Sequence, residues 1–440
     1  MRSEVKPMAA KTPDESDDYR WWRDSTGQAG QERCAAQARL IERTYNRRGG
    51  QRNARRARID AHATDNEFQY LSRRDVVLTR DREAADVYRA LGLKVPRDVK
   101  RTAATPDAVG GLHAVPLPRR WSVEDALREI DLRLGRGVAT PDHVLHVCDA
   151  SICPATEPIP AFVDQPEPRV HADAAADGRR AKVVVVDTGL REDVVAQHDW
   201  LKGVTGDPEG NLVGHYRGHG TFVAGVVRSV APKAVVHVES LMDRAGAVLE
   251  SDLAPALARA LEAAPDIISM SAGTRTRDNH PLLSLQIFYE ERLRHLKGTV
   301  LVAAAGNDNS RHPFWPAAFP WSLSVGALNT RGTRAGYSNY GSWVDVYARG
   351  SGIVNAYPTG KYRYEEPPRK GMTARFDHGM AKWSGTSFST PIVTGLIASR
   401  MTWSGESALE AAKSLLAWAR ENAHVGVGAV LDVDMAALAR

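Results

Sequence analysis

Three polar side chains, far apart in the sequence, are of the types that together make a serine hydroxyl attack a carbonyl group. Asp187 follows the apolar run Val183–Val186, His219 stands between two glycines, and Ser387 ends the run Ser384-Gly385-Thr386-Ser387. A serine hydroxyl is a poor nucleophile at neutral pH, and the pKa of histidine suits the base that it needs. A carboxylate fixes the histidine tautomer and stabilises the imidazolium. The order Asp, His, Ser is one of the known orders of this machinery, so these residues form a candidate triad.

A fourth residue, Asn307, has the chemistry to stabilise the negative charge that such a reaction creates. It follows the run Ala303-Ala304-Ala305-Gly306, which is typical of the end of a buried strand. A side-chain amide there can donate to an oxyanion, an effect of about 3–4 kcal/mol. Ser387 is expected to open a helix, whose N-terminal field favours negative charge. We expect Pro391 in the first turn of that helix, where no intrahelical N–H bond is lost.

The elements that must position these residues alternate between strands and helices. Continuous apolar runs predict buried strands at Val183–Val186, Ala234–Val238, Ile267–Met270 and Thr299–Ala304. Helical spacing predicts helices at His219–Val230, Ser251–Ala264 and Leu282–Leu296. This alternation predicts an α/β fold with a parallel sheet covered by helices on both faces. Active sites of such sheets collect at the carboxyl ends of the strands, where the candidate residues stand.

These motifs resemble those of the subtilases, or subtilisin-like serine proteases, from about Asp149 to Val433. The run Gly385–Pro391 matches the Gly-Thr-Ser-x-x-x-Pro pattern of that family, and the intervals between the candidate residues suit it. The resemblance implies a subtilisin-like catalytic domain with Asp187, His219 and Ser387 as its triad. It also implies an oxyanion hole made by Asn307 and the backbone N–H of Ser387.

The resemblance also assigns a cleft that binds the substrate. One wall, which would pair with the substrate backbone, contains Ser269, Ser271, Ala272 and Gly273. The opposite wall of the primary specificity pocket would be Ala304, Ala305 and Gly306. Phe314 stands where many relatives have a small residue at the pocket floor. We therefore expect a shallow pocket that prefers small or medium residues before the scissile bond.

The chain divides into three predicted zones, at residues 1–65, 66–148 and 149–440. The first is a polar, Arg-rich extension, and the last is the peptidase domain. The middle zone predicts a small α+β unit, with strands at Asp75–Thr79, Leu112–Leu117 and His143–Val147 and helices at Glu83–Leu91 and Ser122–Leu134. Its end, Asp142–Cys148, resembles the end of a subtilase pro-domain, a ferredoxin-like inhibitor and folding chaperone whose tail lies in the active-site cleft. This implies autocleavage between Cys148 and Asp149, with Leu145 and Val147 filling cleft subsites.

Composition narrows the partners. The chain has 440 residues and a net charge of +5, and residues 1–65 hold fourteen Lys and Arg against ten Asp and Glu. The Arg run between Arg47 and Arg58 lacks interleaved aromatic residues and a nucleic-acid-binding motif, so we expect a solvated tail and no nucleic-acid partner. No run of about eighteen apolar residues predicts a membrane span. The first twenty residues lack the apolar core of a secretory signal, so we expect a cytoplasmic protein. Its three cysteines agree with a reducing compartment.

No cofactor or metal is expected. The helix after His219 runs directly into Ala231-Pro232, without the insertion that commonly builds a calcium loop in the family, so calcium is possible but unsupported. Cys148 and Cys153 lack the partner pair that a zinc site needs. The expected partners are a peptide or protein substrate and the chain's own pro-domain as an intramolecular inhibitor, and the oligomeric state stays open. Residues 356–383 are longer than usual and are interpreted as a surface loop.

Three functional readings remain. The first is a serine endopeptidase of regulated intracellular processing, and the second is a catalytically silent pseudoprotease that binds peptides in the same groove. The triplet Asp187-Thr188-Gly189 also occurs in aspartic proteases, but those enzymes need two such carboxylates and the sequence has one triplet in an α/β context. The complete triad and Asn307 favour the endopeptidase. Asp187 alone would be interpreted as a turn residue. The interpretation as an endopeptidase therefore depends on the occurrence of all four candidate residues together.

Overall fold

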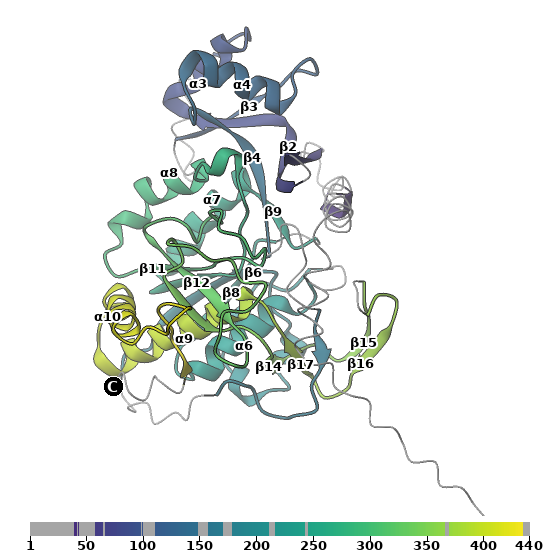
Figure 1. Ribbon diagram of the computed structural model, residues 1–440, viewed down its shortest axis with the longest axis vertical. Helices are drawn as coiled ribbons and strands as arrows, with labels where there is room; N and C mark the ends of the chain where they lie inside the picture. Colours follow the sequence, from purple (N-terminus) through teal and green to yellow (C-terminus); the bar gives the residue numbers. More distant parts are fainter. Residues whose placement is uncertain are drawn as a thin grey trace, which may run out of the picture.

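A computed structural model describes the chain at residues 39–41, 43, 58–64, 67–97, 99, 111–147, 157–169, 178–210, 216–242, 245–365 and 369–433. It contains an N-terminal unit (residues 58–147) and a C-terminal domain (residues 157–433), which lie one above the other in Figure 1. The predicted cleavage position at Cys148 and Asp149, Cys153, and most of the Arg-rich extension lie outside the described residues.

A seven-stranded parallel sheet forms the centre of the C-terminal domain (Figure 1). The strand order is β13 (Val346–Arg349), β12 (Ser322–Leu328), β11 (Val300–Ala304), β10 (Ile267–Met270), β6 (Lys182–Asp187), β8 (Val235–Ser240) and β7 (Thr205–Gly206). Each neighbouring pair is parallel. The four inner apolar residues of β6, Val183–Val186, are all buried, because both faces of the sheet are covered.

Helices cover the two faces of this sheet. The sheet separates two hydrophobic cores, and alternate side chains of β6 belong to different ones. Val183 and Val185 belong to the first core, and Val184 and Val186 belong to the second. The first core contains side chains of α6 (His219–Val230), α9 (Thr386–Ser404) and α10 (Ala408–Glu421). The second contains those of α7 (Glu250–Ala260) and α8 (Leu283–Glu291). The predicted α/β architecture is therefore confirmed.

The N-terminal unit is an antiparallel sheet with two helices. The elements are β1 (Ile59–Thr64), β2 (Glu67–Arg80), α3 (Asp81–Ala90), β3 (Leu112–Pro116), α4 (Val123–Leu134) and β4 (Ala139–His146). The long strand β2 pairs with β1, β3 and β4. Ser122 caps α4 by accepting a hydrogen bond from the backbone of Asp125, as its sequence position predicted. The ferredoxin-like fold and the pro-domain role expected for this unit stay predictions.

The structure moves several predicted boundaries. Because β1 pairs with β2, the boundary expected after residue 65 divides a hairpin, and the unit's sheet begins at Ile59. The helix predicted to reach Leu296 ends at Glu291, since the backbone of Arg292 leaves helical geometry and a 3-10 turn follows. Near the start of the zone predicted as the peptidase domain, β5 (Ile159–Pro160) joins a small sheet.

Short strands complete the C-terminal domain. The sheet that contains β5 also holds β14 (Ile353–Ala356) and β17 (Met380–Trp383). The predicted surface loop forms the hairpin of β15 (Gly360–Arg363) and β16 (Thr373–Phe376), which projects at the right of Figure 1. The remaining short strand is β9 (Ala247–Leu249), and the remaining short α-helix is α5 (Glu192–Val195).

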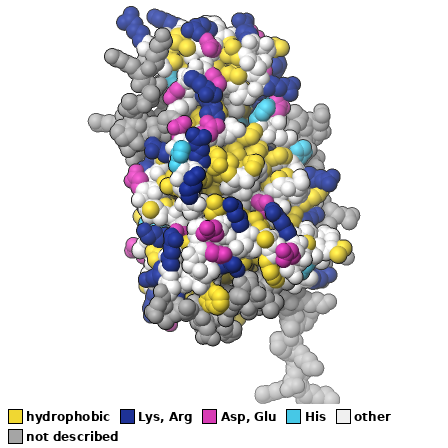
Figure 2. Space-filling model, turned by 90° about the vertical axis from the view of Figure 1, so that its left-hand side faces the viewer, with side chains coloured by type: hydrophobic (Ala, Val, Ile, Leu, Met, Phe, Trp, Pro, Cys, Tyr) yellow, Lys and Arg dark blue, Asp and Glu magenta, His cyan; other side chains and the backbone are white. Residues whose placement is uncertain are grey.

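On the face of the molecule shown in Figure 2, basic side chains are interspersed with acidic ones. No helix of the described residues is long and apolar enough to span a membrane.

The contact between α6 and α9 generates a stability prediction. A Cβ atom added to Gly395 of α9 would lie 2.6 Å from Cβ of Val230, so Gly395→Ala must push the two helices apart. We expect this overpacking to lower the free energy of unfolding by about 1–3 kcal/mol. Urea unfolding in a Ser387→Ala background, which removes any self-digestion, measures it.

Gly298→Ala is the matched control for this measurement. Its added Cβ would meet only Cβ of Ser407, at an ordinary 3.5 Å. We expect a change within about 0.5 kcal/mol. Equal stability of the two variants would contradict the tight packing of α6 on α9.

Candidate active site

The first pair of candidate residues meets where β6 ends and α6 begins. Asp187 is the last residue of β6 and His219 the first of α6, and both side chains are at most 1% exposed. The imidazole Nδ1 lies 2.8 Å from Oδ1 of Asp187, which also accepts the backbone N–H of Thr188 at 2.8 Å. Since a carboxylate only accepts, Nδ1 of His219 carries the hydrogen and Nε2 presents its lone pair. The imidazole is thus oriented as a base.

A glycine beside His219 permits this close approach. A Cβ atom on Gly220 would lie 2.5 Å from the carbonyl oxygen of Gly189 and 3.3 Å from Cβ of Asp187. The backbone N–H of Gly220 instead donates to the Thr188 hydroxyl at 3.0 Å. Any side chain at this position would separate the helix start from the strand end. The glycine of the motif therefore sets the distance between the carboxylate and the imidazole.

Ser387 lies in the first turn of α9, on a neighbouring element. The ring of the next residue, Phe388, lies 5.4 Å from the imidazole of His219, and the ring of Trp383 lies 5.3 Å from it. Oγ of Ser387 and Nε2 of His219 are both buried, and neither has a hydrogen-bond partner among the described residues. The two elements are thus brought together without a direct hydrogen bond between the two side chains. Such bonds are often long in enzymes without substrate.

Pro391 does not stand where the sequence suggested. It is the sixth residue of α9, beyond the first turn, so its missing N–H removes a bond that the helix would otherwise make to the carbonyl of Ser387. The Ser271 hydroxyl donates to that carbonyl instead, at 3.0 Å. Because Pro391 has no N–H, the carbonyl oxygen of Ser387 can accept a hydrogen bond from outside the helix. Its bond with Ser271 connects the start of α9 to the predicted substrate-binding wall.

Asn307 is held against the start of α9. Its Oδ1 accepts both the backbone N–H of Thr386, at 2.9 Å, and the hydroxyl of Thr386, at 3.0 Å. The amide nitrogen therefore points away from Thr386. The position that a Cβ on Gly385 would occupy lies 3.6 Å from Nδ2 of Asn307 and 3.7 Å from the backbone nitrogen of Ser387. Two nitrogens that can donate thus converge on one region beside Ser387.

The predicted wall residues divide between the cleft and the core. The backbone of Ser269 is paired on both sides, with β6 and β11, and its hydroxyl accepts from Thr394 of α9 at 3.0 Å. Ser269 therefore supports the wall and cannot pair with a substrate, contrary to the prediction. Ser271 anchors the start of α9, and Ala272 lies buried beside it. The backbone of Gly273 pairs with His146 of β4, with which it exchanges two hydrogen bonds.

Phe314 lies between the two predicted walls. A Cβ atom on Gly273 would lie 2.3 Å from Cε1 of its ring, and one on Gly306 would lie 3.0 Å from its Cγ. The ring is fully buried. Ala304 and Ala305, also buried, continue the second wall from β11. The ring therefore fills the space between the two glycines.

Sequence reasoning missed two residues of this site. Thr386 orients Asn307, and its place in the Gly-Thr-Ser run was a signal for it. No sequence motif marks Glu209. Its carboxylate accepts the backbone N–H of Gly218, the residue just before His219, and only the tertiary structure brings the two together. Among the described residues, no group of three or more His, Cys, Asp or Glu could hold a metal ion. The expectations on calcium and on cofactors stay predictions.

Comparison with known proteins agrees with this geometry. Residues 178–426 match the family model described as "Subtilase family". Thermitase of Thermoactinomyces vulgaris is 29% identical over 250 residues, which are 53% of this chain and 78% of thermitase. Subtilisin NAT of Bacillus subtilis subsp. natto is 26% identical over 71% of this chain and 78% of its own length.

A likeness to a solved structure supports the fold. Fervidolysin from Fervidobacterium pennivorans, described as a keratinolytic enzyme related to subtilisin, superimposes with a TM-score of 0.55 at 19% identity. The match covers 86% of this chain and 62% of fervidolysin. The family model spans more than half of the chain, including all four candidate residues. The protein therefore belongs to the subtilase family and is a serine-type endopeptidase.

Proposed function

We propose that this endopeptidase cuts peptide bonds with Ser387 as nucleophile, His219 as base and Asp187 as the group that orients the base. The observation that carries the proposal is the buried 2.8 Å hydrogen bond between His219 and Asp187, beside the first turn of α9. This bond leaves Nε2 of His219 as an acceptor next to the helix that carries Ser387. An alcohol, an imidazole and a carboxylate from three distant stretches of sequence thus share one buried site.

The proposed reaction passes through an acyl-enzyme. Oγ of Ser387 attacks the peptide carbonyl while its proton moves to Nε2 of His219, and Asp187 stabilises the imidazolium. The imidazolium then gives that proton to the departing amine, which leaves Ser387 acylated. Water, deprotonated by His219, attacks the acyl carbon and releases Ser387 with its proton restored. Nδ2 of Asn307 and the N–H of Ser387 donate to the oxyanion, since both nitrogens face the region beside Gly385.

We propose that the N-terminal unit inhibits the enzyme through its last strand. β4 pairs antiparallel with β9 through Val144–His146. The N–H of Val147 continues this pairing by donating to the carbonyl of Gly246, just before β9, at 2.9 Å. On the other side of the strand, His146 exchanges hydrogen bonds of 3.0 and 3.1 Å with Gly273. Leu145 and Val147 are fully buried in the C-terminal domain's core. A segment paired in this way occupies the place where a substrate backbone would bind.

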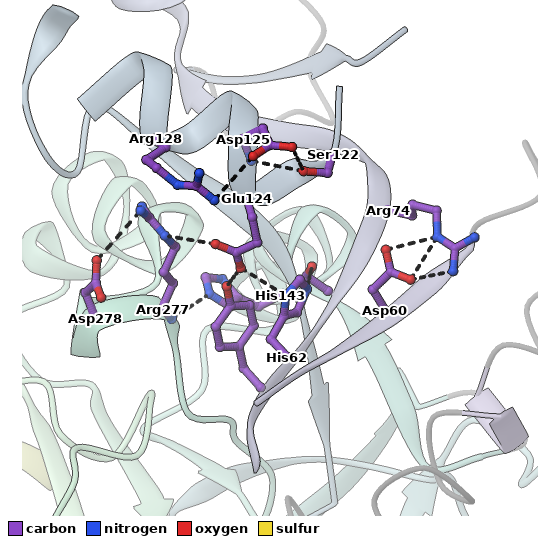
Figure 3. Close-up of polar contacts among 12 residues, drawn as sticks. Asp60, His62, Arg74, Ser122, Glu124, Asp125, Arg128, His143, Arg277 and Asp278 are labelled. Carbon is purple, nitrogen blue, oxygen red and sulfur yellow. Dashed lines mark hydrogen bonds and ion pairs between the residues drawn. The ribbon is translucent and has the colours of Figure 1, made fainter. Parts of the chain in front are cut away.

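Charged contacts hold the same unit in place (Figure 3). Arg277 of the C-terminal domain contacts Asp131 at 2.8 Å. It also contacts Glu124 at 3.7 Å, as Figure 3 shows. The hydrogen bond from His62 holds the pKa of Glu124 down at about 2, so this carboxylate is charged at neutral pH. His143 contacts the buried Glu250 at 2.7 Å, and its Nε2 accepts the backbone N–H of Arg277 at 3.3 Å (Figure 3). These contacts support a docked unit that must be displaced before a substrate enters.

The unit also satisfies the start of a helix in the C-terminal domain. The carboxylate of Asp142 accepts the backbone N–H of Ser251 at 3.0 Å and its hydroxyl at 2.9 Å, in the first turn of α7. Burial raises the pKa of Asp142 to about 7, so this acid is only partly ionised at neutral pH, and its two hydrogen bonds satisfy the helix start. We propose on these grounds that the chain matures by cutting itself between Cys148 and Asp149, as a regulated processing enzyme. The cytoplasmic location stays a prediction from the sequence.

Phe314 supports a proposal on specificity. Its ring fills the space between Gly273 and Gly306, so little depth is left for a side chain that precedes the scissile bond. We propose a preference for small or medium residues at that position. The residue that would occupy it in self-cleavage, Cys148, is itself small.

Ser387→Ala tests the proposed nucleophile. Without the hydroxyl, kcat should fall about 10⁴-fold or more, and a fluorophosphonate probe should no longer label the protein. Mass spectrometry should find the cut after residue 148 in the wild type and an intact chain in the variant. Ser389→Ala is the control, since it removes another buried hydroxyl of α9, bonded only to Thr386 in the hydrogen bonds described. If the wild type is neither labelled nor cut, the peptide-binding pseudoprotease replaces this proposal.

Arg277→Ala tests the docking of the N-terminal unit. The loss of partly buried contacts to Asp131 and Glu124 should release the unit about 5–100 times faster after processing. The rate at which peptidase activity appears measures the release. Arg89→Ala, which removes an exposed contact to Asp86 within the unit, should change this rate less than about twofold. Equal rates in both variants would show that these charges do not hold the inhibitor.

Phe314→Ala tests the pocket depth. We expect kcat/KM for peptides with Phe or Tyr before the scissile bond to rise about 10-fold or more relative to peptides with Ala. A peptide library read by mass spectrometry measures both. Labelling by the fluorophosphonate probe shows that the variant is folded. Strong cleavage after Phe or Tyr by the wild type would refute the shallow pocket.

A further inference from the structure

A second buried carboxylate, Glu209, lies behind the His219–Asp187 pair. It belongs to the segment after β7, and its side chain is 1% exposed. Its Oε1 accepts the backbone N–H of Gly218, the residue directly before His219. The backbone of Glu209 also donates to the carbonyl of Leu190 at 2.9 Å, three residues after Asp187. The residue therefore contacts the chain on both sides of the pair without touching either side chain.

The backbone that Glu209 holds has an unusual conformation. Gly218 has a φ of +76°, in the left-handed region, and it is the N-cap of α6. A Cβ on it would lie 2.5 Å from Cδ of Pro358, so the residue is also confined from the other side. The direction in which α6 starts, and with it the position of the imidazole, depends on this one peptide unit. Glu209 is the side chain that binds it.

The charges around Glu209 come from several elements. Nη1 of Arg191 lies 3.6 Å from its Oε2, and Arg217 also favours its charged form. Asp187 opposes the charge, and the buried Tyr357 lies within its field. Burial is the largest effect and raises the pKa of Glu209 to about 7. An acid with a raised pKa gains its charge only as the pH rises through that value, so the charge develops in the neutral range.

We propose that Glu209 is a positioning residue for the catalytic histidine: it fixes the peptide unit before His219, and its negative charge favours the imidazolium formed during catalysis. This inference rests on the proposed triad. A carboxylate in this place acts twice, since an oxygen that accepts the N–H sets the geometry and a nearby charge adds to the field of Asp187.

Two substitutions separate these effects. Glu209→Ala removes the acceptor and the charge, and we expect kcat to fall about 10–100-fold with KM changed less than about threefold. Glu209→Gln keeps an oxygen that accepts the N–H of Gly218, and should recover kcat to within about 5-fold of wild type at pH 6. We then compare kcat of the wild type with kcat of Glu209→Gln as the pH increases. Their ratio should rise about 3–10-fold as the pH passes about 7, because the glutamate gains its charge there while glutamine stays neutral.

The matched control is Asp193→Asn, which removes another partner of Arg191, at the surface. It should leave kcat within about twofold of wild type at every pH. If Glu209→Ala matches this control, Glu209 does not position the histidine. If the ratio of wild type to Glu209→Gln is flat from pH 6 to 9, its charge plays no part. Fluorophosphonate labelling of wild type beside Ser387→Ala shows separately whether the triad itself operates.

Discussion

The structure depends on keeping a carboxylate buried beside an imidazole. Removing a charged or polar group from water is costly unless hydrogen bonds replace the lost hydration. Asp187 has two such bonds to one oxygen, from the side chain of His219 and the backbone of Thr188. The bond from His219 requires that α6 start at the end of β6, and a side chain on Gly220 would prevent it. The motif around the histidine is thus a packing requirement as well as a chemical one.

A second constraint applies at the start of α9. Two nitrogen donors, on Asn307 and on the backbone of Ser387, must lie on the same side of the first helix turn as the Ser387 hydroxyl. Thr386 fixes the amide of Asn307, and Ser271 fixes the carbonyl of Ser387. That carbonyl is available because Pro391 has no N–H to donate within the helix. Three short contacts therefore join the segments that follow β10 and β11 to the start of α9 near Ser387. In the proposed reaction, donors held in this way would need little rearrangement.

The last strand of the N-terminal unit, β4, pairs with strands of both parts of the chain. β4 pairs with β2 of its own sheet and continues beside β9 of the C-terminal domain (Figure 1). Backbone pairing does not depend on side-chain identity, so an edge that accepts β4 can accept other extended chains. The buried side chains and the charged contacts around Arg277 add the selectivity that pairing alone lacks.

The sequence by itself determined the family, the alternation of strands and helices, and the candidates Asp187, His219, Asn307 and Ser387. Buried strands read as continuous apolar runs, and short motifs fix the residues around a reacting group, so both are visible without a structure. It could not reveal that Pro391 lies beyond the first turn, that Ser269 is paired within the sheet, or that residues before 65 add a strand. Glu209 was invisible for the same reason. Its contact with Gly218 joins residues whose meeting depends on how β7, Leu190 and α6 pack, and only tertiary structure decides that.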